Sequence, residues 1–189
     1  MQIKILKIWI SVLSVALISL ACKVSVGGPD YPSSSVPVSM EAVSNLELQV
    51  EAAQTAAAQT GVITLIINET QITSLLAMKL ASQPDPFIQN PQVYLRDNEI
   101  LVYGQATQGN LSANVRIILN ANIDQDGKPF IKISSAEFGP FPAPDGLNSS
   151  ISTFIDQAFT GALGPAATGL RLDTIAIADG IMTLTGHVK

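Results

Sequence analysis

The stretch from Leu111 to Asp124, LSANVRIILNANID, decides the fold of this 189-residue chain. Apolar and polar side chains alternate along this stretch, which is longer than an ordinary β-strand, and only Ile118 breaks the alternation. A period of two residues places the apolar side chains on one face of an extended strand. We therefore predict a long, half-buried β-strand that forms one wall of the core.

Two-residue turn signals on both sides of this stretch predict that the neighbouring strands are antiparallel. Asp97-Asn98 precedes it, Asp126-Gly127 follows it directly, and Asp179-Gly180 lies near the end of the chain. Such pairs readily adopt the left-handed backbone that tight hairpins require. The turns join strands expected at residues 92–96, 99–103, 130–138, 174–178 and 182–188. Consecutive hairpins form a meander rather than alternating strand–helix units.

Two segments of the same region have the apolar spacing of helices. The first follows a short strand over 62–67 and begins at Asn68, with Gln71 placed to complete a capping box. The second, over 147–163, has a broad apolar face and ends before a glycine and a proline. We therefore expect an α+β domain over residues 61–189, in which an antiparallel sheet packs on one long C-terminal helix and one shorter helix.

Residues 40–60 are rich in alanine, glutamine and glutamate and predict a separate helix. Its apolar stripe is narrow and ends in alanines, which favours an exposed or loosely docked helix, with a coiled-coil seam as the alternative. Residues 23–39 contain three prolines, a Gly-Gly pair and a serine run. That composition predicts a flexible tether with a reach of roughly 20–25 Å.

The N-terminus has the features of an export signal. Two lysines precede an uncharged run of 14 residues, 8–21, which is shorter than the roughly 20 residues of a membrane-spanning helix. The single cysteine of the chain, Cys22, follows directly. We therefore predict a signal peptide over 1–21 and a tether over 22–39 that begins at a lipidated Cys22, as in a bacterial lipobox.

Two alternatives to lipidation stay open. Lipoboxes favour leucine three positions before the cysteine, but this chain has Ser19 there. Ser19 and Ala21 also form the small-residue pattern of an ordinary signal-peptidase site, and cleavage there would secrete the protein with a free Cys22. An uncleaved N-terminal anchor is the second alternative. Two or three acyl chains on Cys22 would hold the protein stably on the extracytoplasmic face of the bacterial cell membrane.

Composition argues against several functions. The chain has a formal net charge of -5 and a pI near 4.7, whereas nucleic-acid binding needs a basic face. One cysteine and one histidine, His187, exclude a disulfide framework and a cysteine-rich zinc site. The turn at 124–127 lacks the other ligands of a calcium loop. No nucleophile–base pair is recognisable, so we expect no enzyme, no metal and no cofactor.

The order of these elements resembles a known group of proteins. The capped helix NETQITSLL (68–76), the hairpin YLRDNEILVYG (94–104) and the crossing SAEFGPFPAP (135–144) follow one another as in YpmS-like membrane-anchored envelope proteins, which are similar to tubular lipid-binding (TULIP) domains. The resemblance covers residues 61–189. It implies a strongly curved antiparallel sheet wrapped around a long helix, with an apolar groove between them that holds lipid tails.

We therefore predict a non-enzymatic extracytoplasmic lipoprotein that binds a lipid or another apolar ligand between helix and sheet. The candidate groove residues are Ile72, Leu75, Leu76, Phe154, Ile155 and Phe159. The same residues would equally form an ordinary core between helix and sheet. The alternative function is a protein-interaction module of the envelope, which would dock a partner through the 40–60 helix or an exposed edge strand.

Overall fold

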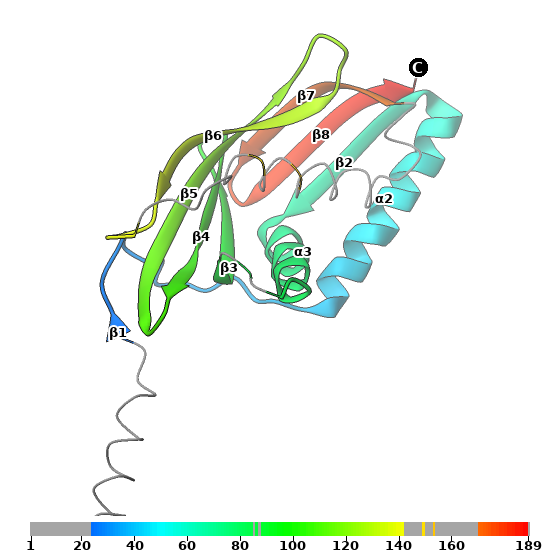
Figure 1. Ribbon diagram of the computed structural model, residues 1–189. Helices are drawn as coiled ribbons and strands as arrows, with labels where there is room; N and C mark the ends of the chain where they lie inside the picture. The colour runs from blue at the N-terminus through cyan, green and yellow to red at the C-terminus, as the bar shows by residue number, and fades with distance from the viewer. Residues whose placement is uncertain are drawn as a thin grey trace, which may run out of the picture.

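The computed structural model describes residues 24–84, 86, 88–141, 149, 153 and 170–188. Within these residues the chain forms two sheets with two helices packed against them (Figure 1). In chain order the elements are β1 (Val24–Ser25), α2 (Met40–Thr60), β2 (Val62–Asn68), α3 (Glu69–Ala81), β3 (Gln89–Arg96), β4 (Glu99–Gln108), β5 (Leu111–Ile123), β6 (Pro129–Glu137), β7 (Leu170–Ala178) and β8 (Ile181–Val188).

The first sheet is built around β5, the long strand that the alternating stretch predicted. Strands β4 and β3 follow it on one side as antiparallel neighbours. On its other side, β6 pairs with the C-terminal part of β5, and the two residues of β1 pair in parallel with Leu111 and Ser112. The register between β5 and β6 shifts directly after Ile118, the residue that interrupts the alternation.

Two of the three predicted hairpin turns are two-residue turns with the expected backbone conformation, whereas the third, after β5, is a longer loop over 124–128. Asp97 and Asn98 between β3 and β4 have φ of 50° and 64°, and Asp179 and Gly180 between β7 and β8 have φ of 50° and 82°. Gly127, in the turn after β5, has φ of 76°. Asp, Asn and Gly adopt this left-handed conformation at low cost, and it matches the twist of the flanking strands.

A second sheet, with the order β2-β8-β7, brings together strands from the beginning and the end of the folded chain. Strand β2 pairs with β8 over its whole length. Backbone hydrogen bonds connect this sheet to the first: Asn98 N donates to Ile177 O at 3.0 Å, and Leu172 N donates to Gly127 O at 2.9 Å. Figure 1 shows the arm formed by β5 and β6 arching toward β7 at this second contact.

The fold class expected from the sequence is wrong. The described residues are mostly β-structure in two sheets, whereas we expected one sheet packed on a long C-terminal helix and a shorter helix. The helices on the core are α2 and α3, which both precede β3. Of the helix expected over 147–163, the structure describes only Ser149 and Thr153, both helical. Apolar periodicity identifies the face of a helix that avoids water, but it does not identify the element that packs against that face.

The helix expected over residues 40–60 is α2, with those bounds, but it packs firmly instead of lying exposed. Ser39 caps its first turn, where its Oγ accepts from Ala42 N at 3.1 Å, and the chain leaves the helix through Gly61 in the left-handed conformation. Leu46 and Val50 belong to the main core. The small alanine side chains of the stripe allow α2 to lie against β2 and α3, so a narrow stripe is enough for docking.

Residues 24–39, expected to form a free tether, lie on the outer side of the first sheet. Asn114 Nδ2 donates to Pro29 O at 3.2 Å, and Tyr31 Oη donates to Asn90 O at 2.7 Å. Val36 is buried, which a solvated tether would not allow. These contacts are made with groups more than fifty residues away in sequence, so composition alone does not reveal them.

Candidate functional site

A single apolar core joins the inner sides of both sheets to α2 and α3. On β5, side chains such as Val115, Ile117 and Leu119 are buried in this core, on the face that the alternation predicted. We call this side of each sheet its inner face. Toward the end of β5 the covering becomes incomplete, because Ala121 and Ile123 lie against the core but are only partly buried.

Eleven apolar side chains pack against the border of the core and are only partly buried. They come from α2, α3, β5, β6 and β7 and from the loop after β6, and none of them is polar or charged. We name these residues the apolar band: Ala53, Ile72, Leu75, Leu76, Ala121, Ile123, Ile131, Ile133, Ala136, Phe141 and Ile175. Apolar surface that the fold leaves partly exposed is available to an apolar ligand or a partner.

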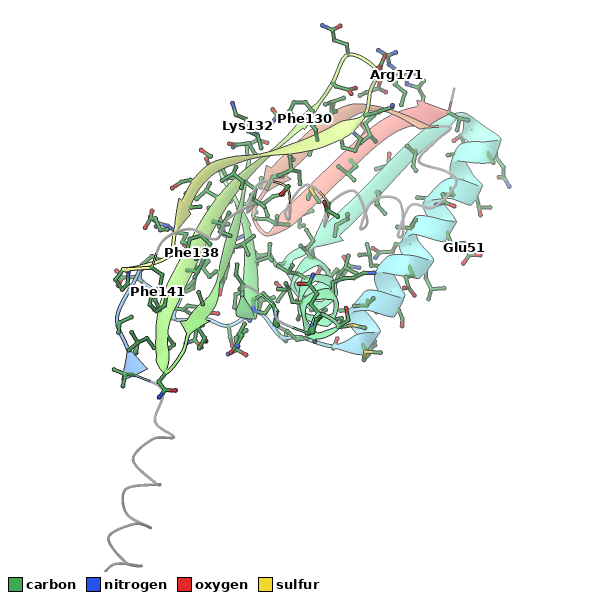
Figure 2. The ribbon with its side chains drawn as sticks, viewed as in Figure 1. Glu51, Phe130, Lys132, Phe138, Phe141 and Arg171 are labelled. Atoms are coloured by element: carbon green, nitrogen blue, oxygen red, sulfur yellow. The ribbon has the colours of Figure 1, made fainter. Side chains whose placement is uncertain are left out.

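The strand pair β5–β6 supplies one side of the band. Ala121 lies opposite Ile131 in the antiparallel register, and residues directly opposite each other share one face of a sheet. Ile131 and Ile133 therefore lie on the inner face, whereas the alternating Phe130 and Lys132 are exposed on the outer face. Figure 2 shows these two side chains along the outer edge of β6.

Helix α3 also contributes to the band, because several of its polar side chains are buried while three of its apolar side chains stay half covered. The nearly completely buried side chains are Gln71, Thr73 and Ser74 and, near the end of the helix, Leu80 of the main core. The half-covered ones are Ile72, Leu75 and Leu76. This orientation reverses the usual one, in which the apolar stripe of an amphipathic helix faces the core and the polar side faces water.

Hydrogen bonds explain how α3 tolerates this orientation. Burial of a polar group costs little free energy when the group is hydrogen-bonded. The buried side of α3 makes three such bonds: Val93 N to Thr73 Oγ1, Ser39 N to Ser74 Oγ, and Gln71 Nε2 to Gln49 Oε1, each at 3.0 Å. The helix is therefore held by polar contacts to β3 and α2, and its three apolar side chains remain available at the border.

The structure describes three of the six predicted groove residues, Ile72, Leu75 and Leu76, and places all three in the apolar band. The other three, Phe154, Ile155 and Phe159, lie outside the described residues, as does Cys22. Sequence reasoning missed the contributions of β6 and β7. The alternation along those strands could have identified their inward positions, but not which positions the helices leave half covered.

His187 has a carboxylate partner. Its Nδ1 lies 3.0 Å from Asp173 Oδ2, and both side chains are about half exposed. A register shift between Leu172 and Thr174 gives Asp173 its position beside β8. General acid–base catalysis requires such a pair to face a bound substrate. This pair lies on an exposed strand surface, and we interpret it as a cross-strand contact.

The outer face of the second sheet is exposed and carries few charges. Its exposed apolar side chains are Val62, Ile66 and Ile181. Threonines lie between them: Thr64 is opposite Thr185, which in turn is opposite Thr174. Charged side chains on this face are confined to one end, at His187, Asp173 and Arg171. A flat, largely neutral face of this kind suits contact with another protein.

Three tyrosines fasten the N-terminal segment to the outer face of the first sheet. The ring of Tyr103 packs edge-on against Tyr31 and Tyr94, with centroids 6.1 Å and 5.7 Å away. Burial raises the pKa of Tyr94 and of Tyr31 above the usual value of 10.0. Beside them, Arg116 Nη2 donates to Glu137 Oε1 at 2.6 Å, and this bond raises the pKa of the guanidinium.

Among the described residues, no group of His, Cys, Asp and Glu side chains could hold a metal ion. In that same part of the chain, no helix has both the length and the apolar character needed to cross a bilayer. No protein-family model matches this sequence, and no curated protein matches it. The function is therefore argued from the geometry of the site.

Proposed function

We propose that this chain is a non-enzymatic extracytoplasmic lipoprotein that binds a lipid tail, or another apolar ligand of that shape, against the apolar band. The observation that carries the proposal is the orientation of α3. Its buried side is fastened by hydrogen bonds to β3 and α2, while Ile72, Leu75 and Leu76 stay half covered. A ligand that covered these three side chains would remove further apolar surface from water.

The chemistry of the band suits an alkyl chain and not a charged group. Its residues are aliphatic apart from Phe141, and the chain as a whole is acidic, with a formal net charge of -5. Each methylene removed from water contributes about 0.8 kcal/mol to binding. An acyl chain that covered the band would therefore bind with several kcal/mol of favourable free energy from apolar contact alone. Any headgroup would remain in solvent.

The anchor is the second part of the proposal. Acylation of Cys22 at the end of the export signal would place this apolar-binding domain at the membrane surface, beside a supply of lipid. If Cys22 is not acylated and the signal peptide is cleaved in the ordinary way, the apolar band would serve a ligand in the extracellular medium.

Ligand binding is tested on the full chain with Cys22→Ser, so that the protein's own acyl chains cannot compete with the added ligand. Native mass spectrometry of the protein purified from its own cells should show a bound lipid. A phospholipid carrying a fluorescent acyl chain should bind the delipidated protein and lose at least tenfold in affinity in Ala121→Phe, because the added ring fills the inner face of β5.

The matched control is Ala176→Phe, which adds the same ring on an exposed outward position of β7. It should bind the probe like the parent protein. Equal binding by both variants, with both folded, would contradict the proposal. A protein that co-purifies in stoichiometric amount, in place of lipid, would favour the interaction-module function, for which the exposed outer face of the second sheet is the natural surface.

A further inference from the structure

We infer that the end of the molecule formed by β1 and the β4–β5 turn lies directly on the bilayer surface. This inference rests on the lipidation of Cys22 in the proposed function and adds the orientation of the anchored domain. The observations that carry it are the pairing of β1 with β5, the exposed apolar side chains at that end, and the distribution of charge along β5.

The hydrogen bonds of β1 begin two residues after the lipidation site. Val24 N donates to Asn110 O and Val26 N donates to Ser112 O, each at 2.8 Å, and Asn114 N donates to Gly27 O at 2.9 Å. Two residues span at most about 7 Å when extended. Acyl chains on Cys22 would therefore be joined to β1 by no more than about 7 Å of chain, in place of a tether with a reach of roughly 20–25 Å.

The surface at this end has the character of a membrane contact. Val24 and Leu111 are partners in the parallel register and are 53% and 41% exposed. Gly139 lies against Gly28 and Ala113, so the loop that carries Phe141 reaches the same end, as Figure 2 shows. Phe141 belongs to the apolar band, so the band begins beside the surface that would contact lipid.

Charge is distributed unequally between the two ends of β5. Residues 24–29, 106–113 and 138–141 contain no charged side chain. The turn at the opposite end contains Asp124, Asp126 and Lys128, with Arg171 donating to Gln125 O at 3.0 Å. Exposed apolar groups gain free energy at the boundary between headgroups and acyl chains, whereas a carboxylate is costly to move out of water. The neutral end therefore faces the bilayer, and the charged turn points into solvent.

The test uses the full lipidated protein in phosphatidylcholine vesicles, with one fluorophore at either end of β5. Cys22 is the only native cysteine, and its thiol is consumed by acylation, so Asn110→Cys and Asp126→Cys each introduce a single reactive site. The two positions are about 40 Å apart along the 13-residue strand. Quenching by aqueous iodide should fall severalfold at position 110 when the protein enters vesicles and should not change at position 126.

The pairing of β1 is tested by Val26→Pro, which removes the amide that donates to Ser112 O. The label at position 110 should regain its iodide quenching while the protein still floats with the vesicles. In case this variant does not fold, Leu111→Asp introduces a charge at the contact and should have the same effect.

The possible failures are distinguishable. The first failure concerns protein that floats with the vesicles. If iodide quenches the labels at positions 110 and 126 equally, or if vesicles shield the label at 126, the proposed orientation is wrong but the lipid anchor is intact. Wild-type protein that does not float would remove the anchor of the proposed function, and the orientation with it.

Discussion

Thr73 on α3 accepts a hydrogen bond from the backbone amide of Val93 on β3 at 3.0 Å, and both residues are completely buried. Strand β3 forms the edge of the first sheet, so this amide has no strand partner. The hydroxyl of a helix residue takes the place of the missing strand. The bond thus gives the buried amide of Val93 a partner at the edge of the sheet, and it holds Thr73 on the inward side of α3.

Removal of that hydroxyl should destabilise the protein. Thr73→Val keeps the shape of the side chain and leaves Val93 N–H buried without a partner, which costs about 1–3 kcal/mol. Chemical denaturation should show this loss in the free energy of unfolding. Thr73→Ser keeps the hydroxyl, loses one methyl group and should retain most of the stability. An equal loss in both variants would show that packing, not the hydrogen bond, matters at this position.

Helix α2 should behave as part of the core. Leu46→Ala removes a side chain that is 4% exposed and should lower the free energy of unfolding by about 2–5 kcal/mol. Leu48→Ala is the control on the same helix, because Leu48 is 62% exposed and its truncation should change stability by less than about 0.5 kcal/mol. Similar small effects at both positions would restore the loosely docked helix that the sequence favoured.

Gly127 should tolerate substitution less well than Gly109. Both have positive φ, 76° and 61°, so alanine at either site costs roughly 1 kcal/mol of backbone strain. A Cβ at Gly127 would also lie 2.2 Å from Arg171 Cγ and 3.2 Å from Arg171 Cα, whereas one at Gly109 meets nothing within 4 Å.

Gly127→Ala should therefore cost about 1–3 kcal/mol more than Gly109→Ala in thermal or denaturant unfolding, because it also disturbs the contact between the two sheets. Equal losses would mean that the arm of β5 and β6 adjusts freely against β7.

The protein should lose stability in alkali through Tyr94. Burial raises the pKa of this phenol above 10.0, so the folded state holds its proton more tightly than the unfolded state. The contribution is complete below about pH 10 and is lost as the pH rises through the pKa of the folded state. The free energy of unfolding should therefore fall more steeply above pH 10 in wild type than in Tyr94→Phe.

Tyr31 adds to the same dependence, since burial also raises its pKa. A double Tyr31→Phe, Tyr94→Phe variant should accordingly show the flattest profile above pH 10. Profiles that run parallel in all three proteins would exclude the tyrosine cluster as the cause.

The sequence by itself determined the features that depend on residues close together in the chain. The turn at Asp97-Asn98 and the capping box of Asn68 and Gln71 were predicted correctly, because each is a set of backbone conformations and hydrogen bonds within about four residues. The alternation after Leu111 correctly predicted which face of β5 is buried. These signals act before any distant segment is in place.

Only the tertiary structure decided how the elements combine. Strand β2 finds its partner more than a hundred residues later in β8, and the buried Val36 donates its amide to Gln92 Oε1 on β3, 56 residues further along the chain. Such pairings decide that there are two sheets and that α2 is part of the core. They also decide that Ile72, Leu75 and Leu76 border the core instead of filling it. An amphipathic pattern specifies which side chains avoid water, but the free energy of burial is realised only against whichever surface the rest of the chain supplies.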